Sequence, residues 1–208
     1  MTGGKSISSA LDVSRETLGM LEEFTDLVRK WTRRINLISA KSMDDAFERH
    51  TLDSAQIYRL ASNEATTWAD FGSGGGFPGL VIAIMAKSEG RDLHVTLVES
   101  DQRKSVFLAT AARNFGLNTD IRTERVESIQ PLEVDVISAR ALAPLDKLLD
   151  YADRHGRQDT VCLFPKGRNA ETEIQDAKRR WNFSNEAIPS ITDPEAAILR
   201  IKGVSRVR

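Results

Sequence analysis

The residues best suited to chemistry lie in the glycine-rich segment Asp70–Gly79, which reads DFGSGGGFPG. Glycines let the backbone turn sharply and approach a ligand closely, because no Cβ intervenes. A short apolar run precedes the segment and a helical apolar run follows it, which is the context that nucleotide-binding loops require. Glu99 stands 23 residues after Gly76, and an acid at about that spacing can accept hydrogen bonds from a ribose diol. The segment and Glu99 together predict a nucleoside-binding site.

The glycines fit two different nucleoside-binding patterns. Gly74, Gly76 and Gly79 satisfy the dinucleotide fingerprint G-x-G-x-x-G, which favours an NAD(P)- or flavin-dependent oxidoreductase. In the other frame Asp70 stands two residues before Gly72, and this frame resembles motif I of the seven-stranded S-adenosylmethionine-dependent methyltransferases. The acid favours the methyltransferase pattern, and the oxidoreductase remains the alternative hypothesis.

Further motifs accompany the glycine loop along most of the chain. In order, they are Trp31–Ser39, Arg49–Ser54, Gly72–Gly79, Arg103–Leu108, Arg125–Glu127, Ser138–Ala141 and Lys166–Gly167. In this order they resemble the small-subunit ribosomal RNA methyltransferase G family, also called glucose-inhibited division protein B. Two small departures from the family pattern are Thr32, where asparagine is usual, and the extra Ala139 before Arg140.

The resemblance implies an activity and a set of cofactor contacts. The activity is transfer of a methyl group from S-adenosylmethionine to N7 of guanine-527, in the 530 loop of 16S ribosomal RNA of the small ribosomal subunit. By the same resemblance, the cofactor site is lined by Gly72, Phe77, Val126, Glu127 and Arg140. With the glycine pattern and the spacing of the acid added, the expected cofactor-binding residues are Asp70, Gly72, Gly74, Gly76, Phe77, Glu99, Val126, Glu127 and Arg140.

Methylation at guanine N7 needs little general-base chemistry, because N7 carries an in-plane lone pair and attacks without first losing a proton. The main requirement is to hold N7, the methyl carbon and the departing sulfur in line. Arg140 and Lys166 fall at the carboxyl ends of expected strands, where ligands of open α/β sheets bind, and we expect both to position the substrate. The residues expected to contact RNA are Arg33, Arg34, Arg49, His50, Arg103, Lys104 and Lys166.

The remaining titratable residues indicate no metal and a reducing compartment. His50, His94 and His155 lack the spacing of metal ligands. Cys162 is the single cysteine, so no intramolecular disulfide can form, and its apolar neighbours predict a buried thiol. The longest purely apolar run, Leu80–Ala86, has seven residues, whereas a membrane-spanning helix needs about 20. We therefore expect a cytoplasmic protein without a membrane partner. We also expect a monomer.

The charge balance excludes indiscriminate coating of a polyanion. The 208 residues carry 29 Lys and Arg against 30 Asp and Glu, for a net charge of -1, which still allows a local basic patch.

Segments 29–34 and 178–181 interleave basic and aromatic residues, so a non-catalytic RNA-binding module is one alternative function. A small-molecule methyltransferase is another. Asn36 and Asp53 are either polar contacts near the site or internal capping residues.

Helices and strands alternate from residue 66 onward. Residues 1–60 are predicted to form an N-terminal helical appendage, with one helix capped by Ser14 and another over Met43–Leu60. Residues 61–208 are predicted to form the methyltransferase domain, a Rossmann-like seven-stranded α/β sandwich that ends in an antiparallel hairpin. The expected strands are Thr67–Phe71, His94–Glu99, Asp120–Thr123, Val134–Ser138, Val161–Phe164, Phe183–Ile188 and Ala197–Lys202. The expected helices that connect them are Gly79–Ala86, Arg103–Phe115, Pro144–Tyr151 and Asn169–Arg180.

Overall fold

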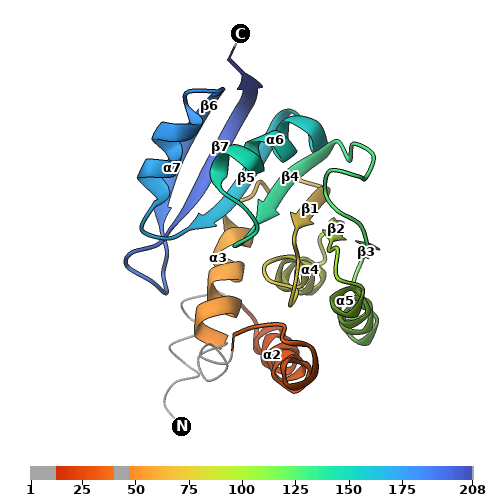
Figure 1. The fold of residues 1–208 in the computed structure, drawn as a ribbon. Coiled ribbons are helices and arrows are strands. Elements are labelled where there is room, and N and C mark those ends of the chain that lie inside the picture. Colours follow the sequence, from red (N-terminus) through yellow and green to blue (C-terminus); the bar gives the residue numbers. More distant parts are fainter. Residues whose placement is uncertain (1–12, 40–46, 208) are drawn as a thin grey trace.

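The computed structural model describes residues 13–39 and 47–207, and its centre is one seven-stranded sheet with helices on both faces (Figure 1). The strand order is β3-β2-β1-β4-β5-β7-β6. Strands β1 to β5 run parallel, and β7 lies antiparallel between β5 and β6. The strands are β1 (Thr67–Phe71), β2 (His94–Val98), β3 (Thr119–Arg122), β4 (Val134–Ala139), β5 (Gly156–Lys166), β6 (Trp181–Pro189) and β7 (Ala197–Arg206). The predicted fold class and terminal hairpin are confirmed.

Six α-helices surround the sheet in the described part of the chain. They are α2 (Arg15–Ile35), α3 (Asp53–Arg59), α4 (Gly79–Ser88), α5 (Gln102–Phe115), α6 (Leu145–His155) and α7 (Ala170–Ala177). The predicted cap of the first helix is confirmed, because Ser14 Oγ accepts a 3.1 Å hydrogen bond from the backbone N–H of Thr17. The helix predicted from residue 43 is described from Phe47, where a π-helical stretch to Leu52 leads into α3. Residues 43–46 lie outside the described residues.

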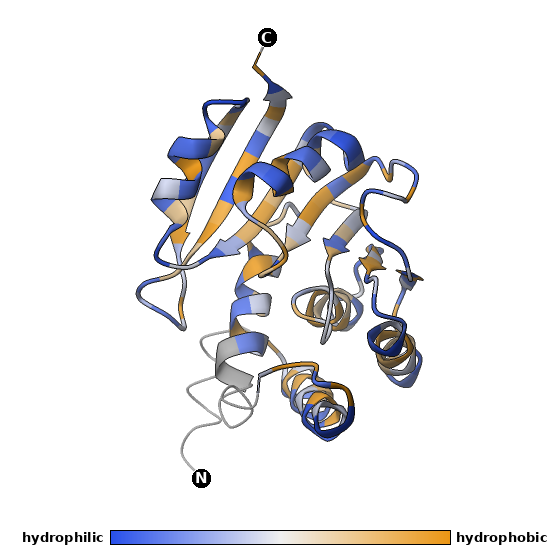
Figure 2. Ribbon diagram, in the orientation of Figure 1, coloured by the Kyte–Doolittle hydropathy of each residue, from blue (hydrophilic) through white to orange (hydrophobic). Residues whose placement is uncertain are grey.

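Alternate strand residues face two hydrophobic layers. In β1, Trp68 packs on the side of α2 to α5, whereas Ala69 and Phe71 pack on the side of α6 and α7. In β5, Leu163 joins the first layer and Phe164 the second. A strand whose side chains alternate between two buried faces shows a continuous apolar run, which is typical of a covered parallel sheet. Figure 2 shows the hydrophobic residues concentrated in the strands and in α4.

The N-terminal helices share a core with the rest of the protein. Buried residues of α2 and α3, such as Phe24 and Ile57, belong to the same hydrophobic cluster as those of α4 and α5. The ring of Trp31 lies 5.5 Å from that of Phe107, so α2 packs directly along α5. The boundary between an N-terminal appendage and a methyltransferase domain at residue 60 stays a prediction. Within the described residues, no helix is both long and apolar enough to cross a membrane.

The end of α7 differs from the prediction. The helix stops at Ala177 rather than Arg180, because Trp181 is buried and begins β6. Its indole N–H donates to Asp146 at 2.9 Å, and Arg180 forms an ion pair with the same carboxylate. The aromatic residue of segment 178–181 is therefore not available for stacking on a base. Cys162 is buried as predicted, and burial raises the pKa of its thiol to about 12.

Candidate active site

The candidate site lies at the carboxyl ends of β1, β2 and β4. The chain leaves β1 toward β2 on one side, and β4 lies on the other side of β1, so the strand order changes direction there. Ligands of open α/β sheets bind at such a switch point. In the part of the chain that the structure describes, three adjoining pockets lie at this edge, and Arg140 and Ala141 line all of them.

The three pockets differ in the elements that complete them. The β2-side pocket, about 370 Å³, is lined by Glu99, Val126 and Glu127, among others. The central pocket, about 480 Å³, lies beside His50, Asp53 and Phe77. The β5-side pocket, about 880 Å³, extends to Lys166 and the start of α7. Lys104, Gly72 and Gly74 line both the β2-side and the central pocket, so the glycine loop separates and borders these two spaces.

The first half of the glycine loop is fixed against the end of β2. The backbone N–H of Gly72 donates to the carbonyl of Val98 at 2.8 Å, and that of Gly74 donates to Glu99 Oε2 at 2.9 Å. Gly72 has a φ of +67°, and a Cβ at this position would lie 2.7 Å from Leu142 Cδ1. Glycine is therefore required there both for its conformation and for the close approach of Leu142.

Asp70 and Gly76 lie behind the loop rather than on a pocket wall. Asp70 is 0% exposed, and its carboxylate accepts hydrogen bonds from Ser138 Oγ and from the N–H of Gly79. Burial raises the pKa of Asp70 to about 6, against the opposing effect of these hydrogen bonds. The sequence predicted that Asp70 binds the cofactor, but Asp70 is not among the residues that line the three pockets. Gly76, at a φ of +84°, is also buried and turns the chain toward α4.

Arg140 is the cation at the junction of the three pockets. Its guanidinium lies over the ring of Phe77, 5.3 Å from the centroid. Burial lowers the pKa of Arg140 to about 10, and the negative charges of Asp53 and Asp70 oppose this shift. Among residues 13–39 and 47–207, no side chain forms a hydrogen bond with Arg140, so its donors can serve a ligand. Ala141 follows at a φ of 52°, a strained conformation of the kind found at functional sites.

The outer wall of the β2-side pocket is held by α6. Tyr151 donates to Glu127 Oε1 at 2.6 Å, which lowers the pKa of Glu127. The buried His155 ring pairs through Nε2 with the carbonyl of Val126 at 3.0 Å. Arg154 donates to the carbonyl of Ile129 at 2.9 Å, so Tyr151, Arg154 and His155, at positions i, i+3 and i+4 of α6, all hold the segment that contains Val126 and Glu127. None of these three residues was predicted from the sequence to belong to the site, although their spacing places them on one helix face.

Lys166 is bound by protein groups. Its Nζ lies 2.7 Å from Glu173 Oε2 and 2.9 Å from the carbonyl of Ala143, and its side chain is 10% exposed. Lys166 does line the β5-side pocket. The ion pair with Glu173 neutralises the charge of Lys166. Lys166 therefore stabilises the loop before α6, and its charge is not free to bind a phosphate.

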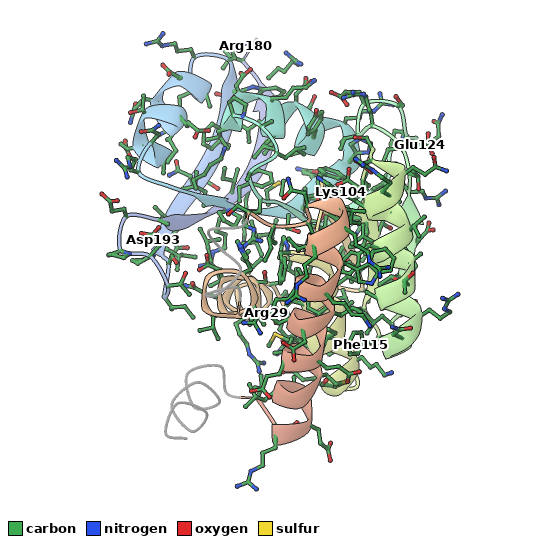
Figure 3. All side chains as sticks on the ribbon, turned by 60° about the horizontal axis from the view of Figure 1, so that its bottom comes forward. Arg29, Lys104, Phe115, Glu124, Arg180 and Asp193 are labelled. Atoms are coloured by element: carbon green, nitrogen blue, oxygen red, sulfur yellow. The ribbon has the colours of Figure 1, made fainter. Side chains whose placement is uncertain are left out.

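The other residues predicted to contact RNA are only partly brought together. Arg33 and Arg34 are exposed in the last turn of α2. Lys104 is half-buried in the first turn of α5, the helix on which α2 packs (Figure 3). Arg103 is exposed and forms an ion pair with Asp101. His50 lines the central pocket and stacks on Phe77, with ring centroids 5.3 Å apart. The side chain of Arg49 lies outside the described residues.

Of the two polar residues left open, Asn36 ends α2 with a φ of 52° and is a capping residue. Asp53 lines the central pocket and also accepts hydrogen bonds from Ser190 and Thr192. In the described part of the chain, no three His, Cys, Asp or Glu side chains form a group that could hold a metal ion.

Comparison with solved structures shows which proteins share this fold. The chain is similar to a TehB-like SAM-dependent methyltransferase from Corynebacterium glutamicum, with a TM-score of 0.57, 15% identity, and coverage of 85% of this chain and 97% of the other. It is also similar to M. jannaschii TYW2 in complex with AdoMet, with a TM-score of 0.54, 12% identity, and coverage of 82% and 78%. At these identities the likeness concerns the fold, which is that of S-adenosylmethionine-dependent methyltransferases.

Comparison of sequences identifies the family. A family model described as rRNA small subunit methyltransferase G matches residues 17–199. A Ruegeria pomeroyi protein named "Ribosomal RNA small subunit methyltransferase G" is 48% identical over 200 residues, covering 96% of this chain and 98% of its own. A Cereibacter sphaeroides protein of the same name is 49% identical over 201 residues, covering 97% of each chain. The chain belongs to the rRNA small subunit methyltransferase G family, which decides between the two glycine patterns in favour of the methyltransferase.

Proposed function

We propose that this protein transfers a methyl group from S-adenosylmethionine to N7 of guanine-527 in the 530 loop of 16S ribosomal RNA. The observation that carries the proposal is the junction at Arg140. There, a pocket bordered by the glycine loop and Glu99 adjoins a larger pocket that can take a substrate base. Membership of the family supports RNA of the small subunit as the substrate.

The residues of the β2-side pocket fit S-adenosylmethionine. Glu99 is 8% exposed and lies at the end of β2, where a carboxylate can accept from both ribose hydroxyls. Val126 adds an apolar surface for a planar base. A Cβ at Gly74 would meet only the carbonyl of Gly72, at 3.7 Å, so the loop backbone leaves room for close approach. When bound, S-adenosylmethionine supplies an electrophilic methyl group on a sulfonium.

Arg140 is placed to orient the substrate rather than to move a proton. Guanine N7 needs no deprotonation before it attacks, so rate enhancement comes chiefly from alignment. The guanidinium can donate to guanine O6 or to a phosphate oxygen and leave N7 free. The guanidinium packs over the ring face of Phe77, which limits how the donors can be directed.

Exposed cations on one side of the site suit a folded RNA. Arg33 and Arg34 are exposed in the last turn of α2, and the half-buried Lys104 lies in the first turn of α5, the helix on which α2 packs. Cations of this kind favour phosphate contacts. We further propose that the protein acts as a monomer.

The test is incubation with labelled S-adenosylmethionine and small subunits from a strain that lacks this protein, followed by mapping of the label. We expect one methyl group per subunit, at N7 of guanine-527. Label on another base would contradict the proposed position. Turnover of a small molecule without RNA would instead support the alternative small-molecule methyltransferase.

A further inference from the structure

Asp193 lies in the loop between β6 and β7 and lines two of the three pockets. It borders the central and the β5-side pocket together with Arg140, and it is not among the residues around the β2-side pocket. Figure 3 shows Asp193 on the side of the molecule away from α2 and Lys104. A base held between Arg140 and Asp193 would therefore have Asp193 on the side remote from Glu99.

The loop that carries Asp193 is fixed to α3. Asp53 Oδ1 accepts hydrogen bonds from Ser190 Oγ and Thr192 Oγ1, both at 2.8 Å. Gln56 donates to the carbonyl of Pro189 at 2.8 Å and accepts from the N–H of Ile191 at 3.1 Å. Side chains that select a base must be held by packing or hydrogen bonds, and these four bonds provide that support.

Asp193 retains an unused carboxylate oxygen. Its Oδ1 accepts from the N–H of Glu195 at 2.9 Å, and no donor within the described ranges contacts its Oδ2. Glu173, which lines the β5-side pocket as well, is already occupied by Lys166. Asp53 borders the central pocket but not the β5-side pocket, and its charge faces Arg140. Among the described residues, Asp193 is thus the carboxylate that the central and the β5-side pocket share.

A carboxylate in a pocket that receives RNA repels phosphates, so it is favourable only where it accepts hydrogen bonds. The Watson–Crick edge of guanine offers two adjacent donors, N1–H and the N2 amino group. Adenine presents the acceptor N1 at that position and would face the carboxylate unfavourably. Guanine N7 lies on the opposite edge of the base, so a contact at N1 and N2 leaves N7 directed away from Asp193.

We propose that Asp193 recognises the target guanine by accepting hydrogen bonds from N1–H and the N2 amino group. The carboxylate then selects guanine, and it turns N7 toward Arg140 and the β2-side pocket. This proposal rests on the proposed function, because it presumes that the substrate is a guanine methylated at N7.

The test combines a protein variant with a substrate variant. Asp193→Asn keeps an oxygen for the N–H of Glu195 but replaces one acceptor by a donor. Small subunits are reconstituted with 16S ribosomal RNA that carries either guanosine or inosine at position 527, since inosine keeps N1–H and N7 but lacks the N2 amino group. Glu195→Gln, in the same loop and exposed, is the matched control.

For the wild-type protein we expect inosine to lower kcat/KM about tenfold, as for one lost hydrogen bond to a charged group. Asp193→Asn should lower kcat/KM about 100-fold on guanosine subunits, lose less than a further twofold on inosine subunits, and leave the affinity for S-adenosylmethionine unchanged. Glu195→Gln should behave like the wild type.

An inosine effect below twofold in the wild type overturns the proposal without reference to any variant. Equal inosine effects in the wild type and Asp193→Asn also overturn it. Failure of the proposed function is distinguishable, because the wild type would then not methylate N7 on guanosine subunits.

Discussion

Ser138 Oγ donates a 2.7 Å hydrogen bond to Oδ1 of Asp70 and so joins the end of β4 to that of β1. The other oxygen of Asp70 accepts from the N–H of Gly79, at the first residue of α4. A Cβ at Gly79 would lie 2.3 Å from Leu97 Cδ2 and 2.8 Å from that oxygen, so glycine is required for this approach. Asp70 therefore fixes both ends of the glycine loop from beneath it.

Asp70 should make stability depend on pH. Burial raises its pKa from 3.8 to about 6, so the folded chain holds a proton that the unfolded chain releases between these values. The resulting stabilisation is complete below the unfolded pKa and is lost as the pH rises through 6. It is on the order of 3 kcal/mol, because one pKa unit corresponds to about 1.4 kcal/mol. Asp70→Asn cannot ionise and should lack this trend.

Urea unfolding between pH 4 and pH 8 measures this effect. The free energy of unfolding of the wild type should fall relative to that of Asp70→Asn as the pH rises. Asp92→Asn changes an exposed carboxylate and is the matched control, which should parallel the wild type. A difference between the wild type and Asp70→Asn that is constant with pH would contradict the prediction.

Gly72→Ala should weaken both the fold and cofactor binding. The left-handed backbone costs about 1–2 kcal/mol with a side chain, and the clash with Leu142 adds about 1–3 kcal/mol. Gly90 has a φ of +65° with nothing near its Cβ position, so Gly90→Ala carries the backbone cost alone. Urea unfolding and calorimetry with S-adenosylmethionine should show a larger loss for Gly72→Ala on both counts. Equal losses of stability would show that Leu142 yields without cost.

Arg140→Lys should lower the rate of methyl transfer on the order of 100-fold. Lysine keeps the charge but loses the planar donor array that lies over Phe77, and small misplacements of a substrate are costly in rate. Single-turnover transfer to small subunits measures the rate. Arg179→Lys, whose side chain is 80% exposed, is the control and should match the wild type. A rate for Arg140→Lys within twofold of the wild type would remove Arg140 from substrate positioning.

The fold was largely predictable because its signals are local. Apolar runs of strand length alternate with helical periodicity, and Ser14 and Pro78 mark where helices begin. Differences remained at the ends of elements. Strand β7 continues to Arg206, four residues beyond the prediction, because its antiparallel pairing with β6 extends there despite exposed side chains. Because the side chains at this end of β7 are mostly exposed, the sequence there has no alternation of apolar and polar residues from which a strand could be predicted.

The site was predictable where one segment carries it and not where distant segments meet. The glycine loop and Glu99 were found from spacing, and both border the pockets. Contacts such as Asp53 with Ser190 join residues 137 positions apart, so no local pattern announces them. Asp70 illustrates the same limit, since its residue type fitted a ligand contact and only the depth of burial shows that it supports the loop.

His155→Phe should weaken the binding of S-adenosylmethionine about tenfold. Phenylalanine keeps the ring contact with Phe71 but removes the donor to the Val126 carbonyl, and an unsatisfied buried carbonyl costs about 1–3 kcal/mol. Burial lowers the pKa of His155, so its contribution to stability is present above about pH 6.5 and is lost as the pH falls. Calorimetry and urea unfolding test both statements, with the exposed His94→Phe as control. An unchanged affinity of His155→Phe for S-adenosylmethionine would show that the β2-side pocket does not depend on the contact between α6 and Val126.

The double variant Arg33→Ala/Arg34→Ala should weaken binding to small subunits without affecting the affinity for S-adenosylmethionine. Each phosphate contact releases counterions, so the slope of log K against log salt should become shallower by about 0.7–0.9 per contact removed. Lys178→Ala/Arg179→Ala removes the same charge from exposed residues at the end of α7 and should leave the slope unchanged. Since the two variants alter net charge equally, a difference between them reports local contact. Equal slopes would instead indicate that binding to RNA depends only on the net charge of the protein. They would contradict phosphate contacts at Arg33 and Arg34.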